Sequence, residues 1–228
     1  MKLEQIKTIT ATLKLMSGLH IGAGDVEMHI GGIDNQVIKN PVTQKPYIPG
    51  SSLKGKIRSL LEWRSGSVDT GPIGIKQINN PKALPILRLF GVGAGDKLND
   101  DEAKKIGPTR LSFWDCYLTD EWDEKLSDMP LEAKSENTIN RISGEATNPR
   151  QTERVPSGVE FDFKLTIKQI SGDTEELLNT VLAGMKLLEL DSLGGSGSRG
   201  YGKVKFENVK IDDEDISGKF KEIQPFTD

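Results

Sequence analysis

The sequence predicts an α+β protein with a ferredoxin-like core and large insertions. Two kinds of hydrophobic pattern support this class. Alternating apolar residues, typical of half-buried strands, occur in residues 8–15, 111–118, 160–167 and 203–209. Apolar residues spaced as on one face of a helix follow the first and the third of these segments. The resulting order of strand, helix, strand, strand, helix, strand is that of the split β-α-β arrangement.

The first half of the core is predicted from residues 7–63. Residues 8–15 indicate the first strand, in which the apolar positions are Ile9, Ala11, Leu13 and Leu15. A Gly-rich stretch leads to a helix pattern with the apolar face Leu53, Ile57, Leu60 and Leu61. Residues 64–108 contain many Gly, Pro and Asn residues and one short apolar island. We therefore expect an insertion with little regular structure there.

The second half of the core is predicted from residues 110–118 and 159–209. Between these parts, residues 119–158 are polar with few apolar anchors, so they form a second insertion. Asp173 with Glu176 three residues later is a capping signature, which places the start of the second helix at Asp173. The whole chain, 1–228, is predicted to be a single domain.

Composition excludes several classes of protein. No run of about 18 apolar residues is present, so no membrane span is expected. The N-terminus leads directly into a strand pattern without a secretory signal, which predicts a cytoplasmic location. Cys116 is the only cysteine, which excludes a disulfide framework and a cysteine-based zinc site. His20 and His29 are the only histidines, so few residues are available to form a serine–histidine triad.

Charge is segregated along the chain, although the net charge is only −4. Residues 39–64 carry six Lys or Arg against Glu62, whereas residues 119–132 carry six acids against Lys125. A segregated distribution supports an anionic ligand on one face of the molecule.

The start of the first predicted helix resembles a phosphate site. Pro49 and Gly50 indicate a turn, and Ser51 or Ser52 is expected to cap the helix. Free N–H groups at a helix start, with Lys54 and Arg58 on one face, would bind phosphate. The alternative is an ordinary capped helix with a solvated basic face.

The segment Gly194–Gly202 holds five glycines in nine residues, which lets the backbone approach a ligand closely. Arg199 would add a phosphate contact and Tyr201 a stacking surface. The segment precedes a strand, so it is neither a P-loop nor a dinucleotide fingerprint. The alternative is a flexible connection, but two Gly-rich basic segments in one chain favour RNA.

Asp34 lies in a third Gly-rich segment, residues 29–35. An aspartate in such a loop is usually part of a turn. As a functional group, its carboxylate would orient or deprotonate a ribose 2′-hydroxyl, or hold a divalent ion.

Taken together, four segments resemble the RAMP proteins of CRISPR systems. They are Leu-His-Ile-Gly at 19–22, Gly-Ile-Asp at 32–34, Tyr-Ile-Pro-Gly-Ser-Ser-Leu-Lys-Gly-Lys at 47–56, and Leu-Gly-Gly-Ser-Gly-Ser-Arg-Gly-Tyr-Gly-Lys at 193–203. The match is close to the repeated backbone subunit of the type III-A Csm effector complex. Residues 137–154 are similar to the thumb of that subunit.

The resemblance implies an RRM-like core, a thumb hairpin at about 133–157 and a lid/helical insertion. It implies copies stacked along a CRISPR RNA beside other Csm subunits, with each thumb displacing a nucleotide of the guide–target duplex. It further implies cleavage of captured single-stranded target RNA at regular intervals, dependent on a divalent ion, for which we expect Mg²⁺. The catalytic aspartate, and the possible metal ligand, would be Asp34. The motifs and the resemblance together predict RNA contacts at His20, Ser51, Ser52, Lys54, Lys56, Arg58, Arg141, Arg150 and Arg199.

Three other interpretations remain. In the first, the chain is a guide-binding scaffold and Asp34 is only a turn residue. The second is a CRISPR-RNA processing endoribonuclease of the same superfamily, which would need an acid–base pair that two histidines hardly supply. The third, an unrelated nucleotide-binding enzyme using residues 194–202, conflicts with the position of that loop before a strand.

Overall fold

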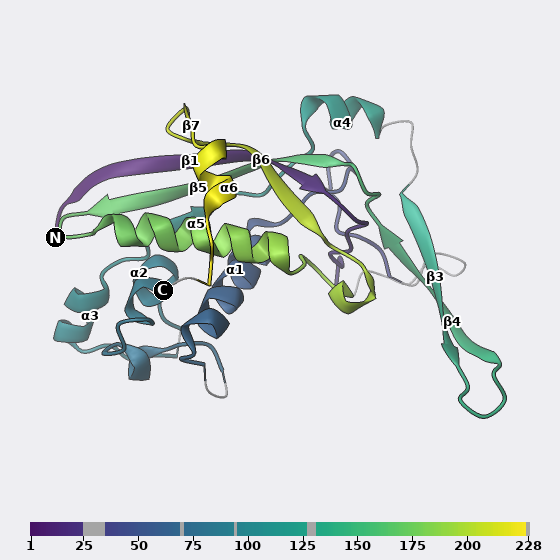
Figure 1. Ribbon diagram of the computed structural model, residues 1–228, viewed down its shortest axis with the longest axis horizontal. Coiled ribbons are helices and arrows are strands. Elements are labelled where there is room, and N and C mark those ends of the chain that lie inside the picture. Colours follow the sequence, from purple (N-terminus) through teal and green to yellow (C-terminus); the bar gives the residue numbers. More distant parts are fainter. Residues whose placement is uncertain (25–34, 69–70, 94, 127–130, 227–228) are drawn as a thin grey trace.

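The computed structural model describes residues 1–24, 35–68, 71–93, 95–126 and 131–226. It contains a five-stranded antiparallel sheet, a separate two-stranded hairpin and several helices (Figure 1). This arrangement confirms the mixed α and β class predicted from the sequence. Among the described residues, no helix is long and apolar enough to cross a membrane.

The sheet has the strand order β2-β5-β1-β6-β7. Its strands are β1 (Leu3–Leu15), β2 (Leu111–Phe113), β5 (Glu160–Ile170), β6 (Val204–Ile211) and β7 (Glu214–Asp215). The long strand β1 lies in the centre, because it pairs with β5 on one side and with β6 on the other. The second predicted strand is shorter than expected. Beyond Phe113, the chain continues beside β5 through separate hydrogen bonds from Trp114 to Lys164 and from Asp162 to Tyr117.

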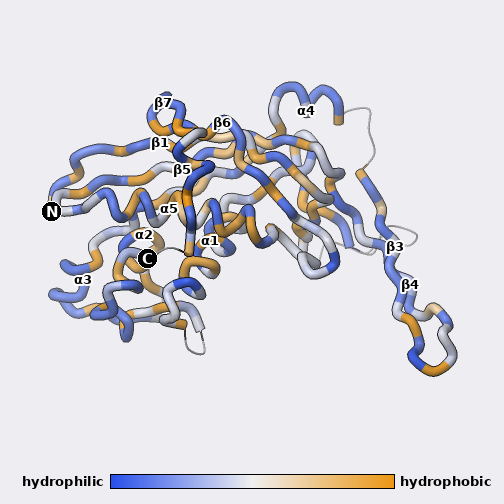
Figure 2. The backbone as a smooth tube through the Cα atoms, in the orientation of Figure 1, coloured by the Kyte–Doolittle hydropathy of each residue, from blue (hydrophilic) through white to orange (hydrophobic). Residues whose placement is uncertain are grey.

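Two long helices, α1 (Gly50–Ser65) and α5 (Glu175–Leu190), cover one face of this sheet (Figure 1). The alternation of β1 directs Ile9 and Leu13 toward these helices, and both side chains are fully buried. The two helices pack closely at Gly184 of α5, where a Cβ atom would lie only 2.7 Å from Cγ2 of Ile57. Figure 2 shows that apolar residues gather between the sheet and the helices, which is the core that the sequence periodicity predicted.

The predicted role of Asp173 as a helix cap is wrong. The N-cap of α5 is Thr174, without a side-chain cap hydrogen bond. Asp173 instead accepts two hydrogen bonds from the Arg110 guanidinium, from Nε at 3.1 Å and from Nη2 at 3.0 Å. Both side chains are almost completely buried. A buried arginine needs a paired carboxylate, so this ion pair takes the side chain that would otherwise cap the helix.

The first insertion is helical, so the prediction of little regular structure for residues 64–108 is wrong. It contains the 3₁₀ turn η1 (Ile75–Gln77) and the helices α2 (Leu84–Phe90) and α3 (Asp100–Ile106). Helix α2 buries most of its apolar residues against the core. Helix α3 begins with a capping box, in which the Asn99 side chain accepts the Glu102 N–H and the Glu102 side chain accepts the Asn99 N–H. Seven-residue helices span two turns, which is too short for a clear periodic pattern.

The second insertion contains α4 (Asp120–Lys125), β3 (Glu132–Ile139) and β4 (Ala146–Arg154). Strands β3 and β4 form a hairpin that projects away from the sheet (Figure 1). The hairpin is mostly hydrophilic, with apolar residues near its turn (Figure 2). One of them, Ile142, is 98% exposed. Near the end of the described residues lies α6 (Ser217–Glu222), which the sequence patterns did not predict.

Candidate nucleic-acid interface

The base of the β3–β4 hairpin is joined to two loops of the core. Leu19 and Val155 exchange backbone hydrogen bonds of 2.9 and 2.8 Å. Further along the same edge of the strand, the Asn35 N–H donates to the Gln151 carbonyl at 3.3 Å, and the Glu153 N–H donates to the Asn35 carbonyl at 2.8 Å. The end of β4 therefore pairs with β3 on one edge and is hydrogen-bonded on its other edge to the segments at residues 19 and 35.

Glu153 strengthens this junction with its side chain. Its buried carboxylate accepts the Val37 N–H at 3.0 Å and a hydrogen bond from Lys39 Nζ at 2.9 Å. The predicted catalytic residue, Asp34, lies outside the described residues. Asn35, which directly follows Asp34 in the chain, is thus anchored to the base of the hairpin.

His20 connects the hairpin to the glycine-rich loop, which we define as residues 194–202. Its Nδ1 atom lies 2.7 Å from the Glu153 carbonyl oxygen, so Nδ1 carries the proton and donates. The His20 carbonyl accepts the Gly195 N–H at 2.9 Å. Gly194 has φ of 74°, and a Cβ atom there would lie 2.3 Å from that carbonyl oxygen. At this position, the close approach that glycine permits is to the backbone of the protein itself.

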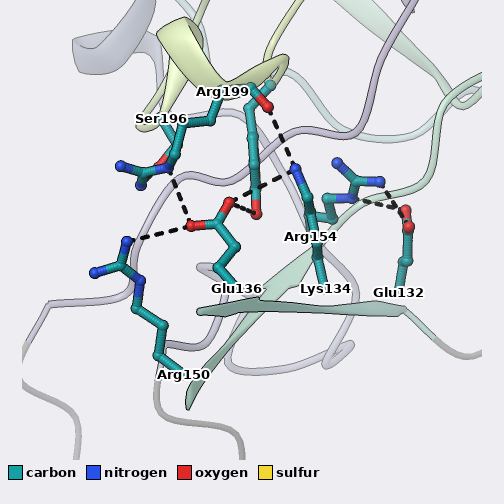
Figure 3. A network of polar contacts seen from close by, with 8 residues as sticks. Glu132, Lys134, Glu136, Arg150, Arg154, Ser196 and Arg199 are labelled. Atoms are coloured by element: carbon teal, nitrogen blue, oxygen red, sulfur yellow. Dashed lines mark hydrogen bonds and ion pairs between the residues drawn. The ribbon is translucent and has the colours of Figure 1, made fainter. Parts of the chain in front are cut away.

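Glu136 of β3 lies where the hairpin meets the glycine-rich loop (Figure 3). Its Oε2 atom lies 3.1 Å from Nε of Arg199 in the loop and 3.5 Å from Nη2 of Arg150 in β4. Its Oε1 atom accepts the Tyr201 hydroxyl at 3.1 Å and lies 3.6 Å from Lys134 Nζ. One carboxylate therefore joins three cations and a phenol from three segments of the chain.

This environment keeps Glu136 ionised. Burial raises the pKa of its carboxyl, but the Tyr201 hydrogen bond and the charges of Arg199, Lys134 and Arg150 outweigh burial and hold the pKa below its ordinary value. Burial, together with the hydrogen bond to Glu136, raises the pKa of Tyr201, which therefore remains a hydrogen-bond donor.

Tyr201 is fully buried, so its predicted role as a stacking surface for a base is wrong. Lys134 Nζ lies 4.4 Å from the centre of its ring, and the Arg154 guanidinium lies 5.0 Å from it. Arg154 also forms a two-pronged ion pair with Glu132, at 2.7 and 2.6 Å. Its side chain packs over Gly18, where a Cβ atom would lie 2.5 Å from Arg154 Cδ. The glycine-rich loop, the hairpin and the segment that follows β1 thus form one packed unit.

Outside α1, the predicted arginine contacts fall in two places. Arg150 and Arg199 lie together at Glu136, and their side chains are 49% and 50% exposed. Arg141 lies in the exposed turn at the far end of the hairpin, where its Nη1 donates to the Ile139 carbonyl at 3.3 Å. The structure thus brings His20, Arg150 and Arg199 to the hairpin base and leaves Arg141 at its tip.

The N-terminus of α1 differs from the prediction. The N-cap is Pro49, and the helix begins at Gly50, so Ser51 and Ser52 lie inside the first turn and neither caps it. The Gly50 N–H donates to the Asp115 carboxylate at 2.7 Å. This carboxylate already accepts one of the N–H groups that a phosphate at the helix start would use. Ser51 is exposed and Ser52 is partly buried.

Lys54 and Arg58 lie one turn apart in α1, as predicted, but Arg58 is engaged by other groups of the protein. Arg58 donates to Glu62 at 2.7 Å and to the Ile73 carbonyl at 2.9 Å, and its side chain is only 17% exposed. It therefore ties α1 to the first insertion. Lys56 forms an ion pair of 2.7 Å with Asp191, at the end of α5 that leads into the glycine-rich loop. Of the basic residues predicted on α1, Lys56 is thus the one fixed near that loop.

The carboxylates of this junction were missed in the sequence. Glu136 pairs across the hairpin with Arg150, and Glu132 pairs with Arg154. Such opposite charges are a recognisable cross-strand signal, but only when the register of the hairpin is known. The described part of the chain contains no group of three or more His, Cys, Asp or Glu residues that would hold a metal ion.

The chain is similar to known proteins over most of its length. The family model of the RAMP superfamily matches residues 12–205. A protein named CRISPR system Cms endoribonuclease Csm3 from Methanothermobacter thermautotrophicus is 40% identical, with 92% of this chain and 87% of the relative covered. A protein of the same name from Streptococcus thermophilus is 45% identical, with 88% and 87% covered.

A solved structure shows a similarity to the same group of proteins. It is described as a crystal structure of a Csm3–Csm4 subcomplex in the type III-A CRISPR-Cas interference complex. One of its chains matches with a TM-score of 0.56 and 29% identity, covering 92% of this chain and 80% of the other. The chain therefore belongs to the RAMP superfamily and, within it, to the Csm3 family.

Proposed function

We propose that the chain is a CRISPR-RNA-binding subunit of a type III-A interference complex that captures complementary target RNA and cleaves it at regular intervals. The observation that carries this proposal is the junction at the hairpin base. There, Glu136 holds the half-exposed Arg150 and Arg199 together. Asn35, which directly follows Asp34, is hydrogen-bonded to β4, the strand that carries Arg150. The endoribonuclease name of the relatives supports the cleavage step.

The finer description of the fold belongs to this proposal. The strand order β2-β5-β1-β6 and the two helices on one face support a ferredoxin-like, RRM-like core within a single domain, residues 1–228. The β3–β4 hairpin would be the thumb. The first insertion, about 64–108, would be the helical insertion implied by the resemblance, and a lid would complete the RNA-binding surface.

RNA recognition would rest on contacts to the backbone. Because base pairing between guide and target supplies sequence specificity, the protein needs cations and backbone amides that hold phosphates. The proposed RNA contacts are His20, Ser51, Ser52, Lys54, Lys56, Arg58, Arg141, Arg150 and Arg199. The half-exposed Arg150 and Arg199 are the best placed of these, whereas Arg58 would first have to leave Glu62.

For cleavage, we assign to the Asp34 carboxylate the orientation or deprotonation of a 2′-hydroxyl. Displacing a nucleotide of the duplex lets that hydroxyl align with its phosphate. Mg²⁺ is commonly held by one or two carboxylates together with phosphate oxygens, which fits a chain whose described residues form no ligand cluster of their own. A divalent ion at Asp34 would supply charge neutralisation at the phosphate.

The proposed partners are guide RNA, single-stranded target RNA, further copies of this chain and other Csm subunits. The structural neighbour supports this assembly, since it comes from a subcomplex of two different subunits. Because guide and target transcripts meet in the cytoplasm, the proposal places the chain there.

The test is target-RNA cleavage by the assembled complex with Mg²⁺, comparing the natural chain with Asp34→Ala. Asp100→Ala, an exposed aspartate on α3, is the charge-matched control. We expect Asp34→Ala to lose the regularly spaced cuts while target binding persists, and Asp100→Ala to cut normally. Unchanged cutting by Asp34→Ala would leave the chain a guide-binding scaffold.

A further inference from the structure

Glu136 has an unusual position for an acidic residue in a surface that would bind RNA. It lies opposite Arg150 in the hairpin, and its side chain is only 11% exposed. Its Oε2 atom contacts guanidinium groups from two separate segments, Arg150 of β4 and Arg199 of the glycine-rich loop (Figure 3). A non-bridging phosphate oxygen would make the same kind of contact with these two groups.

The charges around Glu136 do not cancel. Four cations, Lys134, Arg150, Arg154 and Arg199, surround two carboxylates, Glu132 and Glu136. Arg154 is mostly buried and committed to Glu132 by two short hydrogen bonds. Arg150 and Arg199 are half-exposed instead. The surplus positive charge is therefore presented to solvent by the two arginines that share Glu136.

The two oxygens of Glu136 are held differently. Oε1 accepts a hydrogen bond from the fully buried Tyr201, which fixes the carboxylate from the protein side. The contact of Oε2 with Arg150, at 3.5 Å, is longer than the 2.7–2.9 Å typical of a strong charge-assisted hydrogen bond. Arg150 can therefore leave this contact at a small cost in free energy, while Tyr201 keeps Glu136 in place.

We propose that Glu136 is an internal counterion that occupies Arg150 and Arg199 in the free subunit and is replaced there by an RNA backbone phosphate on binding. Glu136 thus lowers the affinity of the subunit for RNA in general. Only an RNA that makes enough other contacts, such as a guide seated along the whole interface, compensates for the displaced ion pairs. This inference rests on the proposed RNA-binding function and adds a residue that sets its selectivity.

The test is binding of a labelled polyuridine oligonucleotide to the full chain, measured for the natural protein and for Glu136→Gln. Glutamine keeps an oxygen for Tyr201 but removes the charge. We expect Glu136→Gln to bind about three- to tenfold more tightly, because each released, partly exposed ion pair contributes less than about a factor of ten. The affinity of Glu136→Gln should also fall more steeply with salt concentration than that of the natural chain. Its freed arginines bind anions from the solution, and RNA must displace these anions when it binds.

Glu145→Gln is the matched control, because it removes the same charge from the exposed turn of the same hairpin. It should change the affinity less than twofold, which separates a local effect from that of net charge. In a background that carries Arg150→Gln and Arg199→Gln, the Glu136→Gln exchange should no longer tighten binding, because it acts through these two side chains. Thermal unfolding of each variant verifies that it is folded.

Several outcomes would overturn the inference. Weaker binding by Glu136→Gln would show that the carboxylate positions the arginines for RNA and does not compete with it. Equal gains from Glu136→Gln and Glu145→Gln would reduce the effect to net charge. If neither the natural chain nor any folded variant bound RNA, the proposed function itself would fail. Binding by the natural chain without an effect of Glu136→Gln would refute this inference alone.

Discussion

The fit of the glycine-rich loop against His20 makes Gly194→Ala an informative perturbation. A Cβ atom at Gly194 would lie 2.3 Å from the His20 carbonyl oxygen, which accepts the Gly195 N–H. Gly200 offers a matched control in the same loop. Its φ of 84° is close to the 74° of Gly194, but nothing lies within 4 Å of its Cβ position. Both exchanges strain the backbone, and only Gly194→Ala also displaces it.

The expected losses of stability follow from the backbone strain and from the displacement of the backbone. An L residue in the left-handed region costs about 1–2 kcal/mol, which is the whole effect expected on the free energy of unfolding for Gly200→Ala. Gly194→Ala adds the cost of moving packed backbone, about 1–3 kcal/mol by analogy with overpacked cores. For a chain of this size, the extra term lowers the Tm by a further amount of about 2–12 °C.

The assay is thermal unfolding of both variants, followed by circular dichroism, together with RNA affinity. Gly194→Ala should melt well below Gly200→Ala. It should also bind RNA more weakly, because the displaced loop carries Arg199. Equal melting temperatures for the two variants would refute the close approach between the loop and His20.

Three further predictions concern the core. Burial raises the pKa of the Cys116 thiol to about 12. A thiol-specific disulfide reagent at mildly alkaline pH should therefore react with the unfolded chain and not with the folded one. Equal reaction rates for the two states would contradict this burial. Asp173→Asn should lower the free energy of unfolding in urea by about 3–5 kcal/mol, because Arg110 is left buried without its counterion. Lys104→Ala, which removes an exposed ion pair, should cost less than about 1 kcal/mol, and a similar loss in both variants would argue against a buried pair. Burial raises the pKa of the Asp173 carboxyl, but the Arg110 hydrogen bonds and charge hold it below its ordinary value. The stabilisation by the Asp173 carboxylate is therefore complete above its unfolded-state pKa of about 4 and is lost as the pH falls through the lower folded-state pKa. In Asp173→Asn, the free energy of unfolding should depend less on pH in this acidic range. An unchanged pH dependence would contradict an ionised Asp173 paired with Arg110.

The core of the fold could be predicted because its signal is local. Alternation along β1 and β5 and the apolar faces of α1 and α5 are each visible within a window of about a dozen residues. The short helices α2 and α3 lack that length, so tertiary packing and a capping box define them. The capping signature at Asp173 failed because a distant residue, Arg110, competes for the same carboxylate.

The candidate site was predicted in part for a related reason. Cations such as Arg150 and Arg199 stand out in the sequence by type and by motif. The carboxylates that organise them do not, because Glu136 and Glu132 acquire their partners only through the register of the hairpin and the docking of the glycine-rich loop. Tyr201 was predicted to offer a stacking surface in the glycine-rich loop, but whether its ring faces solvent or the interior depends on packing that no local pattern records.

The most direct test of an RNA interface at the hairpin base is photo-crosslinking in the assembled complex. Guide RNA carrying 4-thiouridine would be irradiated, and the crosslinked peptides would be mapped by mass spectrometry. We predict crosslinks within residues 134–154 and 194–202, on both sides of the junction at Glu136. Crosslinks confined to α2 and α3 would contradict this placement and move the RNA to the opposite side of the molecule.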